Sequence, residues 1–471
     1  MSRIRIGWSA ASITPDRKIA LAGQFYERVT EQVRDPVMAV ALALEGEGAD
    51  GGQAVLVGCD LVAVELVLLE RVRELCKRSV PGLNPESIIL CASHTHTGPL
   101  YAVTDRLPMF GQVIRDPDAM GFDEYVEFAA SRIAGAVQEA WERRAPGGIS
   151  HARGMAAIGF NRMVVYDDDT AAMYGNVYTS HFRRMIGPED PRVEMLFTWD
   201  ERGGLTGVLF NSACTAQIAE NQNILTADFY GEVRKLVAER WSPSVYALGI
   251  VGAAGDLAPR DTLNQRHNER DYNKELRSVA LQLFHALETG LAAAKENVET
   301  DTVFSHVCKP LDLPLRKPSK SEAEWAQQYW SEFEARMEKE DDPVAFFLSH
   351  SFEEQNRIFE SHGIVQRMRV LQQTSVYPME LHVIRLGDIA LATNPFELYT
   401  EYGLQIKARS AAKRTFIAQL SGNSGGYLPT ASAVKLGGYS TYLYCGYVGP
   451  DAGEILVDRT VEEINRLWAE T

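Results

Sequence analysis

The sequence predicts an α/β fold in which mixed β-sheets pack together and are covered by helices. Apolar runs of strand length recur along the chain, at residues 53–64, 86–93, 193–213, 244–256 and 377–395. Between them, residues 123–144 and 271–296 have the apolar spacing of amphipathic helices. Strands that alternate with helices in this way favour sheets covered by helices.

Residues 318–375 differ from the rest of the chain because they are charged, helical in pattern and poor in strand signals. The apolar segment 377–395 that follows is expected to form two strands joined at Gly387-Asp388. Because the strands on either side of the insertion need each other as partners, we expect one large domain over residues 1–471, with a helical excursion at about 318–375. A separate second domain is the alternative.

Composition and charge argue against several classes of partner. The chain has 471 residues, 45% of them hydrophobic, and its 63 acidic and 47 basic side chains give a net charge of -16. This charge argues against nucleic acid or an anionic membrane surface as the main partner. No stretch approaches the roughly 18–20 apolar residues of a membrane-spanning helix. We therefore expect a small-molecule substrate and no stable membrane insertion.

The N-terminal segment and the cysteines together predict a cytoplasmic protein. MSRIRIGWSA lacks the apolar stretch that follows the basic start of a signal peptide. The cysteines are scattered and form no CxxC pair, which is typical of buried free thiols in a reducing compartment. The six are Cys59, Cys76, Cys91, Cys214, Cys308 and Cys445.

The sharpest local signal is ASHTHTGP at residues 92–99. His94 and His96 are two positions apart just past a predicted strand, so in an extended chain their side chains point to the same side. Gly98-Pro99 then turns the chain away. Neutral imidazole is a common zinc ligand, and this spacing is a frequent first pair in metal sites. The alternative is a pair of polar side chains that merely cap a strand end.

Three further segments carry candidate chemistry. Glu397 in NPFELYTEYG could be a metal ligand, a general base or an acidic residue at a helix N-terminus. Asp256 lies in the small-residue loop GAAGDLAPR and could orient a histidine. The glycine-rich loop 421–441 contains Tyr427 and Tyr439, although such loops are usually only loops.

In their order along the chain, these segments resemble motifs of the neutral ceramidase family. ASHTHTGP is similar to the family's His-Thr-His-Ser-Gly-Pro segment, and GAAGDLAPR is similar to its Gly-Asp-x-x-Pro loop. Glu397, Tyr427 and Tyr439 match a family glutamate and two family tyrosines. Weaker similarities lie in the same order at ITP (13–15), LAGQFYER (21–28), RDPV (34–37), GFNR (159–162) and TADFYG (226–231). The resemblance spans nearly the whole chain apart from the helical excursion.

The resemblance implies a catalytic domain that binds a divalent metal ion, with zinc expected. His94, Glu397 and Tyr427 would be ligands, together with one more histidine. His96 would support the ligands or face the substrate. Tyr439 and Arg162 would hold the scissile carbonyl, as donors to a developing oxyanion do.

Two departures from the family pattern bear on mechanism. The second zinc histidine of the family falls at Thr215, where the candidates to complete the metal shell are Cys214, Gln217 and Glu220; we predict Gln217. The family serine is replaced by Ala258, whose methyl group excludes a serine-acyl mechanism at that position. The sequence also shows no counterpart of the C-terminal β-domain of secreted ceramidases, so we expect membrane ceramide to be a poor substrate.

The expected function is hydrolysis of an amide bond, with an ester or lactone second, by water activated on the metal. The ranking of bonds comes from the resemblance. His96, Arg162, Asp256 and Tyr439 are the expected catalytic residues, and His94, Gln217, Glu397 and Tyr427 the expected metal ligands. The alternatives are a metal-dependent lyase or isomerase acting on a polar, sugar-like substrate, and a binding protein that has lost its metal.

Overall fold

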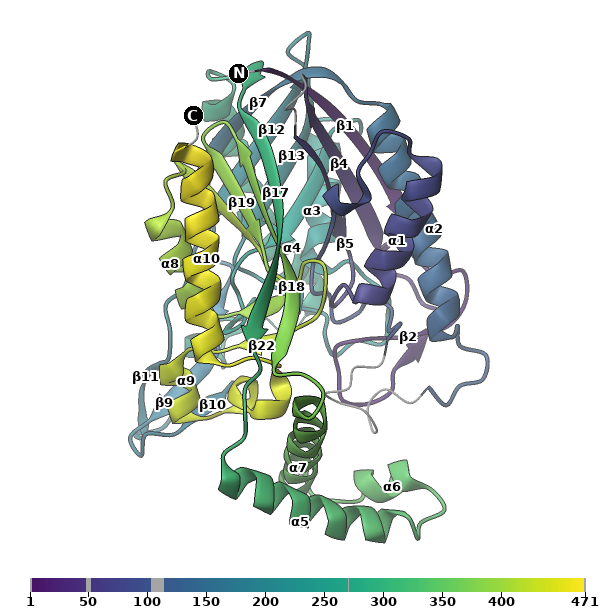
Figure 1. Cartoon of the computed structure of the whole chain (residues 1–471), viewed down its shortest axis with the longest axis vertical. Helices are drawn as coiled ribbons and strands as arrows, with labels where there is room; N and C mark the ends of the chain where they lie inside the picture. The colour runs from purple at the N-terminus through teal and green to yellow at the C-terminus, as the bar shows by residue number, and fades with distance from the viewer. Residues whose placement is uncertain (1, 48–51, 103–113, 270, 470–471) are drawn as a thin grey trace.

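The computed structural model describes residues 2–47, 52–102, 114–269 and 271–469, and it has four layers (Figure 1). A large mixed sheet has the strand order β14-β13-β12-β7-β1-β4-β5-β6, with β16 paired to β1. Neighbours β5 and β6 are parallel, as are β13 and β14. The strands are β1 (Ser2–Ser12), β4 (Met38–Gly46), β5 (Gln53–Cys59), β6 (Ile88–Ala92), β7 (Ala145–Met155), β12 (Arg192–Asp200), β13 (Leu205–Ser212), β14 (Tyr246–Val251) and β16 (Asp301–Thr302).

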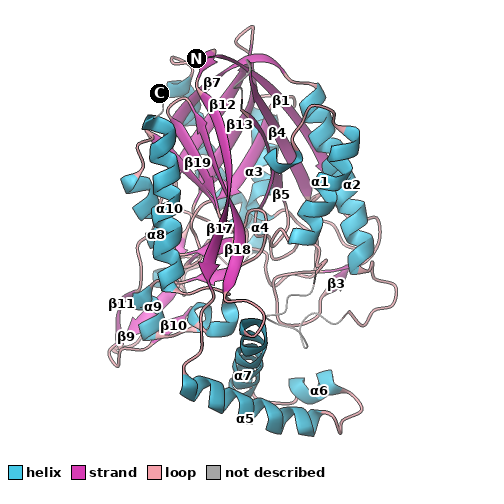
Figure 2. Cartoon of the chain, in the orientation of Figure 1, coloured by secondary structure: helices cyan, strands magenta, loops and turns pink. Residues whose placement is uncertain are grey.

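Helices cover the outer face of this sheet. They are α1 (Leu66–Ser79), α2 (Phe122–Glu142), α3 (Asp228–Arg240) and α4 (Tyr272–Ala294). Strand β4 shows the alternation that makes this possible: Ala39, Ala41 and Ala43 pack toward α1 and α2, whereas Val40, Leu42 and Leu44 point to the opposite face. Figure 2 shows α1 and α2 lying side by side along β4 and β5.

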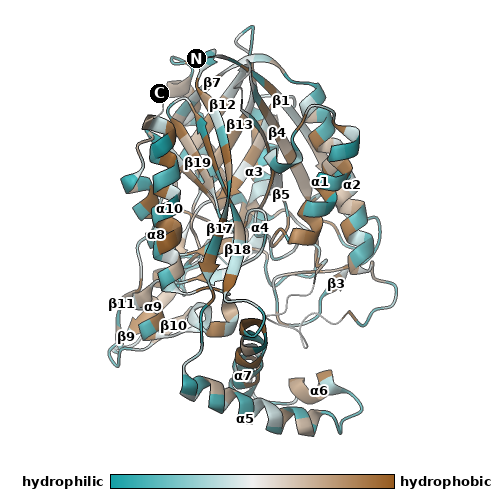
Figure 3. Ribbon diagram, viewed as in Figure 1, coloured by the Kyte–Doolittle hydropathy of each residue, from teal (hydrophilic) through white to brown (hydrophobic). Residues whose placement is uncertain are grey.

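A second sheet packs against the inner face of the first. Its order is β17-β18-β19-β21, with β17 (Phe304–Pro314), β18 (Val376–Leu386), β19 (Ile389–Thr393) and β21 (Arg414–Ala418). Ile384, Leu391 and Phe416 share one buried cluster with Leu196 and Leu209 of the large sheet. The outer face of the second sheet is covered by α8 (Thr400–Arg409) and α10 (Pro450–Ala469). In Figure 3, α10 carries hydrophobic and hydrophilic residues in alternation, as a helix with one buried face should.

The expected fold class, mixed sheets packed together and covered by helices, is therefore confirmed. Three helices, α5 (Lys320–Met337), α6 (Pro343–Leu348) and α7 (Phe352–Leu371), project from the end of the long β17–β18 hairpin (Figure 1). The two strands pair along their full lengths, from Phe304 opposite Leu386 to Pro314 opposite Val376. Ser319 and Ser351 begin α5 and α7 with capping boxes, which explains why helices start there.

The remaining elements are short. They are β2 (Ile19–Ala20), β3 (Val29–Thr30), β8 (Phe160–Asn161), β9 (Met163–Tyr166), β10 (Ala171–Met173), β11 (Phe182–Met185), β15 (Leu257–Ala258), β20 (Phe396–Leu398), β22 (Gly426–Leu428) and α9 (Ala431–Leu436), with 3-10 turns at Pro85–Ser87, Thr262–Asn264, Tyr439–Thr441 and Leu443–Cys445. Of the helices that the structure describes, none combines the length and apolar character needed to span a bilayer. All six cysteines are free and all but Cys308 are buried, as expected.

Loops that follow several strands meet at one end of the two sheets. The His96 backbone N–H after β6 donates to Ala216 O after β13 (3.3 Å), and Ala92 N donates to Leu420 O after β21 (3.2 Å). Gly255 N after β14 donates to Leu398 O of β20 (2.8 Å). These backbone hydrogen bonds join segments from distant parts of the sequence into one scaffold, and the candidate site lies on it.

Candidate functional site

His94 and His96 face each other at the end of β6. Their Nε2 atoms are 3.2 Å apart, and both rings line a cavity. The expected reason for this was wrong, because the chain is not extended here: His94 has φ 61°, in the left-handed region that non-glycine residues rarely adopt. Leu420, which lines the same cavity, also has a positive φ of 52°. Strained backbone of this kind is concentrated at functional sites.

The tautomer of His94 is set by the backbone. Its Nδ1 lies 2.6 Å from the carbonyl oxygen of Val62. Since a carbonyl only accepts, Nδ1 carries the proton and Nε2 presents a lone pair to the cavity. Burial lowers the pKa of His94 and, together with the neighbouring His94 ring, lowers that of His96 well below its usual range. Both imidazoles are therefore neutral at pH 7.

Glu397 lies on β20 and faces His94, with Oε2 3.5 Å from His94 Nε2. It is not an acidic residue of a helix N-terminus, because the first turn of α8 carries Glu401 instead. Strand β20 pairs in parallel with β22, which places Glu397 directly opposite Tyr427. The two side chains are hydrogen-bonded, and burial followed by the charge of Glu397 raises the pKa of Tyr427 well above its usual value. The phenol is thus protonated and donates to the carboxylate.

Arg162 holds the Tyr427 hydroxyl from the other side. Its buried guanidinium donates from Nη2 to Tyr427 Oη (3.1 Å) and to Gly255 O (3.0 Å), and from Nη1 to Tyr174 Oη (3.1 Å). Arg162 does not line the cavity, whereas Tyr439 does, with its ring edge-on to Tyr427 at 5.8 Å. The geometry makes Arg162 a residue that positions Tyr427, and leaves Tyr439 facing the space where a substrate would lie.

The segment that departs from the family pattern lies beside His96. Gln217 Nε2 is 3.0 Å from His96 Nε2, and Thr215 donates its hydroxyl to Gln217 Oε1. The amide thus presents its nitrogen to the histidine, and it would have to rotate by half a turn to offer its oxygen to a metal. Glu220 Oε2 lies 3.6 Å from His96 Nδ1. Cys214 points elsewhere, since its thiol lies 3.0 Å from Ile158 O.

Asp256 and Ala258 do not line the cavity at the histidines. Asp256 Oδ1 accepts from the backbone N–H and the hydroxyl of Thr400 (2.8 and 2.7 Å), and Oδ2 accepts from Asn161 Nδ2 (3.0 Å). These contacts do not include a histidine, so the expectation that Asp256 orients one is not met; it ties the 252–260 loop to the start of α8. Ala258 lines a second, polar cavity, whose lining also includes Gln217.

The cavity at the histidines has a volume of about 170 Å³. His94, His96, Glu397 and Tyr427 are among its polar lining residues, and Phe25, Leu100 and Leu420 are among its apolar ones. The helical excursion packs against the lining of this cavity, because the ring of Phe359 of α7 lies on the ring of Phe25, with 5.8 Å between their centroids. The cavity is therefore lined by both polar and apolar side chains.

Two supporting residues were missed in the sequence. Arg28 donates from Nη2 to His96 O (2.6 Å) and so holds the histidine loop. Gly23 approaches so closely that a Cβ there would lie 2.4 Å from the His96 ring, and its φ is 93°. Both belong to the LAGQFYER segment, so the signal was present in the motif. Val62 O, which accepts from His94 Nδ1, is a backbone group, so no side-chain type in the sequence indicated its role.

Comparison with known proteins supports this fold. No family model and no curated protein matches the sequence. Among solved structures, the neutral ceramidase from Pseudomonas aeruginosa superposes with a TM-score of 0.71 at 17% identity, covering 99% of this chain and 75% of that one. A ceramidase in complex with C2 gives the same TM-score at 16% identity, covering 100% and 76%. The chain thus has a neutral ceramidase-like fold, as the resemblance implied.

Proposed function

We propose that this chain is a metal-dependent hydrolase that cleaves a C–N amide bond in a small or amphiphilic substrate. The observation that carries the proposal is the convergence of His94 Nε2, Glu397 Oε2 and the Tyr427 hydroxyl at one cavity. The fold shared with two ceramidases supports amide hydrolysis over other reactions.

The residues present fit a divalent metal. The lone pair of His94 Nε2 faces an oxygen of Glu397 at 3.5 Å, and no proton lies between them because His94 carries its proton on Nδ1. Two acceptors at this distance repel each other unless they share a cation. An imidazole with a carboxylate and a phenol oxygen suits zinc. His94, Glu397 and Tyr427 would hold the ion, with Gln217 completing the set after rotation of its amide. When bound, such an ion lowers the pKa of water to about 7.

The other residues act on substrate and ligands. Tyr439 faces the cavity and would donate its hydroxyl to the scissile carbonyl oxygen. Arg162 holds Tyr427 in place, and the neutral His96 would accept a hydrogen bond from the substrate or carry its proton. No side-chain nucleophile stands at the position of Ala258. Pockets for drug-sized ligands have volumes of about 300–1,000 Å³, so the 170 Å³ cavity suits a small substrate or only the reactive end of an amphiphilic one.

A metal-dependent lyase or isomerase acting on a polar substrate is the second candidate. The second, polar cavity favours it, since Glu220, Arg260 and Asn268 are among its lining residues. The two reactions differ in the fate of solvent oxygen. In water enriched with oxygen-18, hydrolysis places one labelled oxygen in the carboxylic acid product. Elimination or isomerisation forms no such labelled acid.

His94→Ala tests the proposed function. Removal of this ligand should lower the metal content by about one equivalent per chain and reduce hydrolysis of N-acyl amides by roughly 10²-fold or more. His181→Ala is the matched control, since the His181 side chain is exposed, lies against Asp167 and does not line the cavity. Wild-type metal content in His94→Ala would contradict the assignment. Bound metal without turnover of any amide, ester or lactone would move the proposal to the second candidate.

A further inference from the structure

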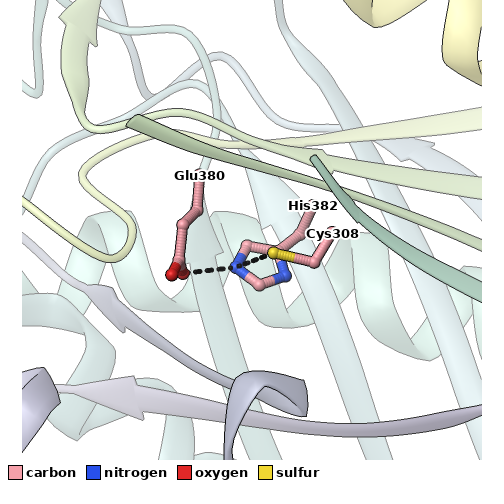
Figure 4. Close-up of side chains that lie close together, drawn as sticks. All are labelled: Cys308, Glu380 and His382. Atoms are coloured by element: carbon pink, nitrogen blue, oxygen red, sulfur yellow. Dashed lines mark hydrogen bonds and ion pairs between the residues drawn. The ribbon is translucent and has the colours of Figure 1, made fainter. Parts of the chain in front are cut away.

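A second group of metal-ligating side chains lies on the β17–β18 hairpin. Cys308 of β17 stands directly opposite His382 of β18, and Glu380 precedes His382 by two positions, so all three point to the same face. His382 Nε2 is 3.1 Å from Glu380 Oε2 and 3.8 Å from Cys308 Sγ. Figure 4 shows the carboxylate and the thiol approaching the same ring nitrogen. None of the three lines the cavity at His94.

The spacing of these atoms suits one small cation. The donor atoms lie within 4.8 Å of one another. A tetrahedral zinc ion with Zn–S about 2.3 Å and Zn–N and Zn–O about 2.0–2.1 Å separates nitrogen from oxygen by about 3.3 Å and nitrogen from sulfur by about 3.6 Å. The observed nitrogen–oxygen distance of 3.1 Å is slightly shorter than this, and the observed nitrogen–sulfur distance of 3.8 Å is slightly longer. An ion could therefore bind with only small side-chain movements.

Hydrogen bonds around the cluster leave one acceptor facing another. His306 Nδ1 lies 2.7 Å from the carbonyl oxygen of Gln53, so Nδ1 donates and Nε2 carries a lone pair. His382 Nδ1 lies 3.0 Å from His306 Nε2 and must supply the proton between them. A His382 ring that carries its single proton on Nδ1 turns the lone pair of Nε2 toward the carboxylate of Glu380. A histidine whose other nitrogen donates to an acceptor is the usual arrangement of a metal ligand.

The same geometry argues against a nucleophile relay. In such a relay, one ring nitrogen takes the proton of the thiol while the other is held by the carboxylate. Here Cys308 and Glu380 contact the same nitrogen, and the other is held by His306. The donor atoms of the three side chains therefore converge on one place, as metal ligands do, and do not form a linear hydrogen-bond relay.

Arg73 of α1 holds Glu380 without using all of its acceptor capacity. Its guanidinium donates to both carboxylate oxygens, at 2.9 and 2.8 Å. Each oxygen has two lone pairs, so one on Oε2 remains for a cation. Arg73 orients the carboxylate and offsets part of its negative charge. The thiolate of Cys308 would then supply the further negative charge that a divalent cation needs from its ligands.

We propose that Cys308, Glu380 and His382 form a second transition-metal site, for which zinc is the fitting ion, separate from the site at His94. Thiolate, imidazole and carboxylate are the ligands that zinc takes in proteins. Cys308 is partly exposed and the Glu380 side chain is 40% exposed, so solvent reaches the site and water can take the fourth position. Through Gln53 of β5 and Arg73 of α1, the site joins the second sheet to the first and to α1.

Cobalt substitution tests the site on the full chain. Metal is removed with a chelator, and Co²⁺ is titrated while the near-ultraviolet thiolate-to-cobalt absorption is recorded. Wild type should bind about two equivalents and show the band. Cys308→Ser should lose the band and one equivalent, His94→Ala should keep the band and lose the other, and His285→Gln, a change at an exposed histidine of α4, should alter neither. If the proposed function fails and the second site is real, wild type binds one equivalent with the band, and His94→Ala changes neither.

A measurement on wild type removes any dependence on the folding of a variant. Zn²⁺ should slow alkylation of Cys308 by iodoacetamide at least tenfold, as followed by peptide mass spectrometry. An unchanged alkylation rate in saturating Zn²⁺, or a cobalt band that is absent from wild type or survives in Cys308→Ser, would overturn the proposal. In that case, a proton on His382 occupies the place assigned to the metal.

Discussion

Replacing Arg162 with methionine tests whether its guanidinium holds the Tyr427 hydroxyl in place. Arg162 is buried and makes three hydrogen bonds, to Tyr427, Gly255 and Tyr174. Methionine occupies a similar path but donates nothing. The buried Gly255 carbonyl then loses this donor, and the Tyr427 hydroxyl becomes free to turn away from Glu397.

We expect the free energy of unfolding of Arg162→Met to fall by about 2–6 kcal/mol. An unsatisfied buried carbonyl costs about 1–3 kcal/mol, and each lost hydroxyl contact about 0.5–1.5 kcal/mol. Metal affinity at the proposed site should fall by roughly 10–100-fold, because Arg162 supports a ligand without being one. Any amidase activity should fall by roughly 10²-fold if the hydroxyl moves by about 1 Å.

Urea unfolding measures the loss of stability, and competition titration of metal measures the loss of metal affinity separately. Tyr174→Phe is the matched control, since it removes the bond from Nη1 and leaves the two from Nη2 intact. Its unfolding free energy should change by less than about 1.5 kcal/mol, and its metal affinity should not change. If Arg162→Met binds metal as tightly as wild type, then either Tyr427 is not a ligand or Arg162 does not hold it, and the reasoning is refuted.

Three other outcomes are expected. Gly23→Ala should be destabilised by about 2 kcal/mol or more and should weaken metal binding, because its Cβ would meet the His96 ring and its φ is positive; denaturation and metal titration check this. Intact-mass spectrometry during turnover should show no acyl adduct in wild type or Ala258→Ser, and the variant should gain little activity, since residue 258 lines the polar cavity. Burial raises the pKa of Asp228 to about 7. Because its unfolded pKa is about 3.9, this group favours the folded state most below about pH 4, and that contribution is lost as the pH rises to about 7; Asp228→Asn should thus cost less stability at pH 7 than at pH 5 in urea unfolding.

The sequence predicted the layered fold because the fold depends on patterns that the chain carries locally. Apolar runs located the sheets, and the charged segment after Lys317 marked the helices that interrupt β17 and β18. His94, His96, Glu397, Tyr427 and Tyr439 were found because ordered motifs pointed to them, and the structure brings them together at one cavity. The left-handed backbone of His94 was not predicted, since no local propensity requires it there.

Other residues could not be placed because their contacts depend on the tertiary fold. Asp256 has the sequence context of a ligand-supporting residue, yet Thr400 and Asn161 use both of its oxygens. Cys308 and His382 are far apart in sequence, with the whole excursion between them. They meet only through the register of the hairpin, which a shift of one residue would abolish.

The two proposed metal sites share one physical requirement that side-chain identity does not express. A histidine can bind a cation through Nε2 only when Nδ1 keeps the proton, and in both sites a backbone carbonyl decides this. Val62 O fixes His94 directly, whereas Gln53 O fixes His306, which in turn fixes His382. Any residue could supply such a carbonyl, so the requirement leaves no trace in the sequence. The histidine pattern therefore predicts where ligands can gather. The backbone carbonyls of Gln53, at the start of β5, and Val62, in the loop after β5, determine which of those ligands face a cation.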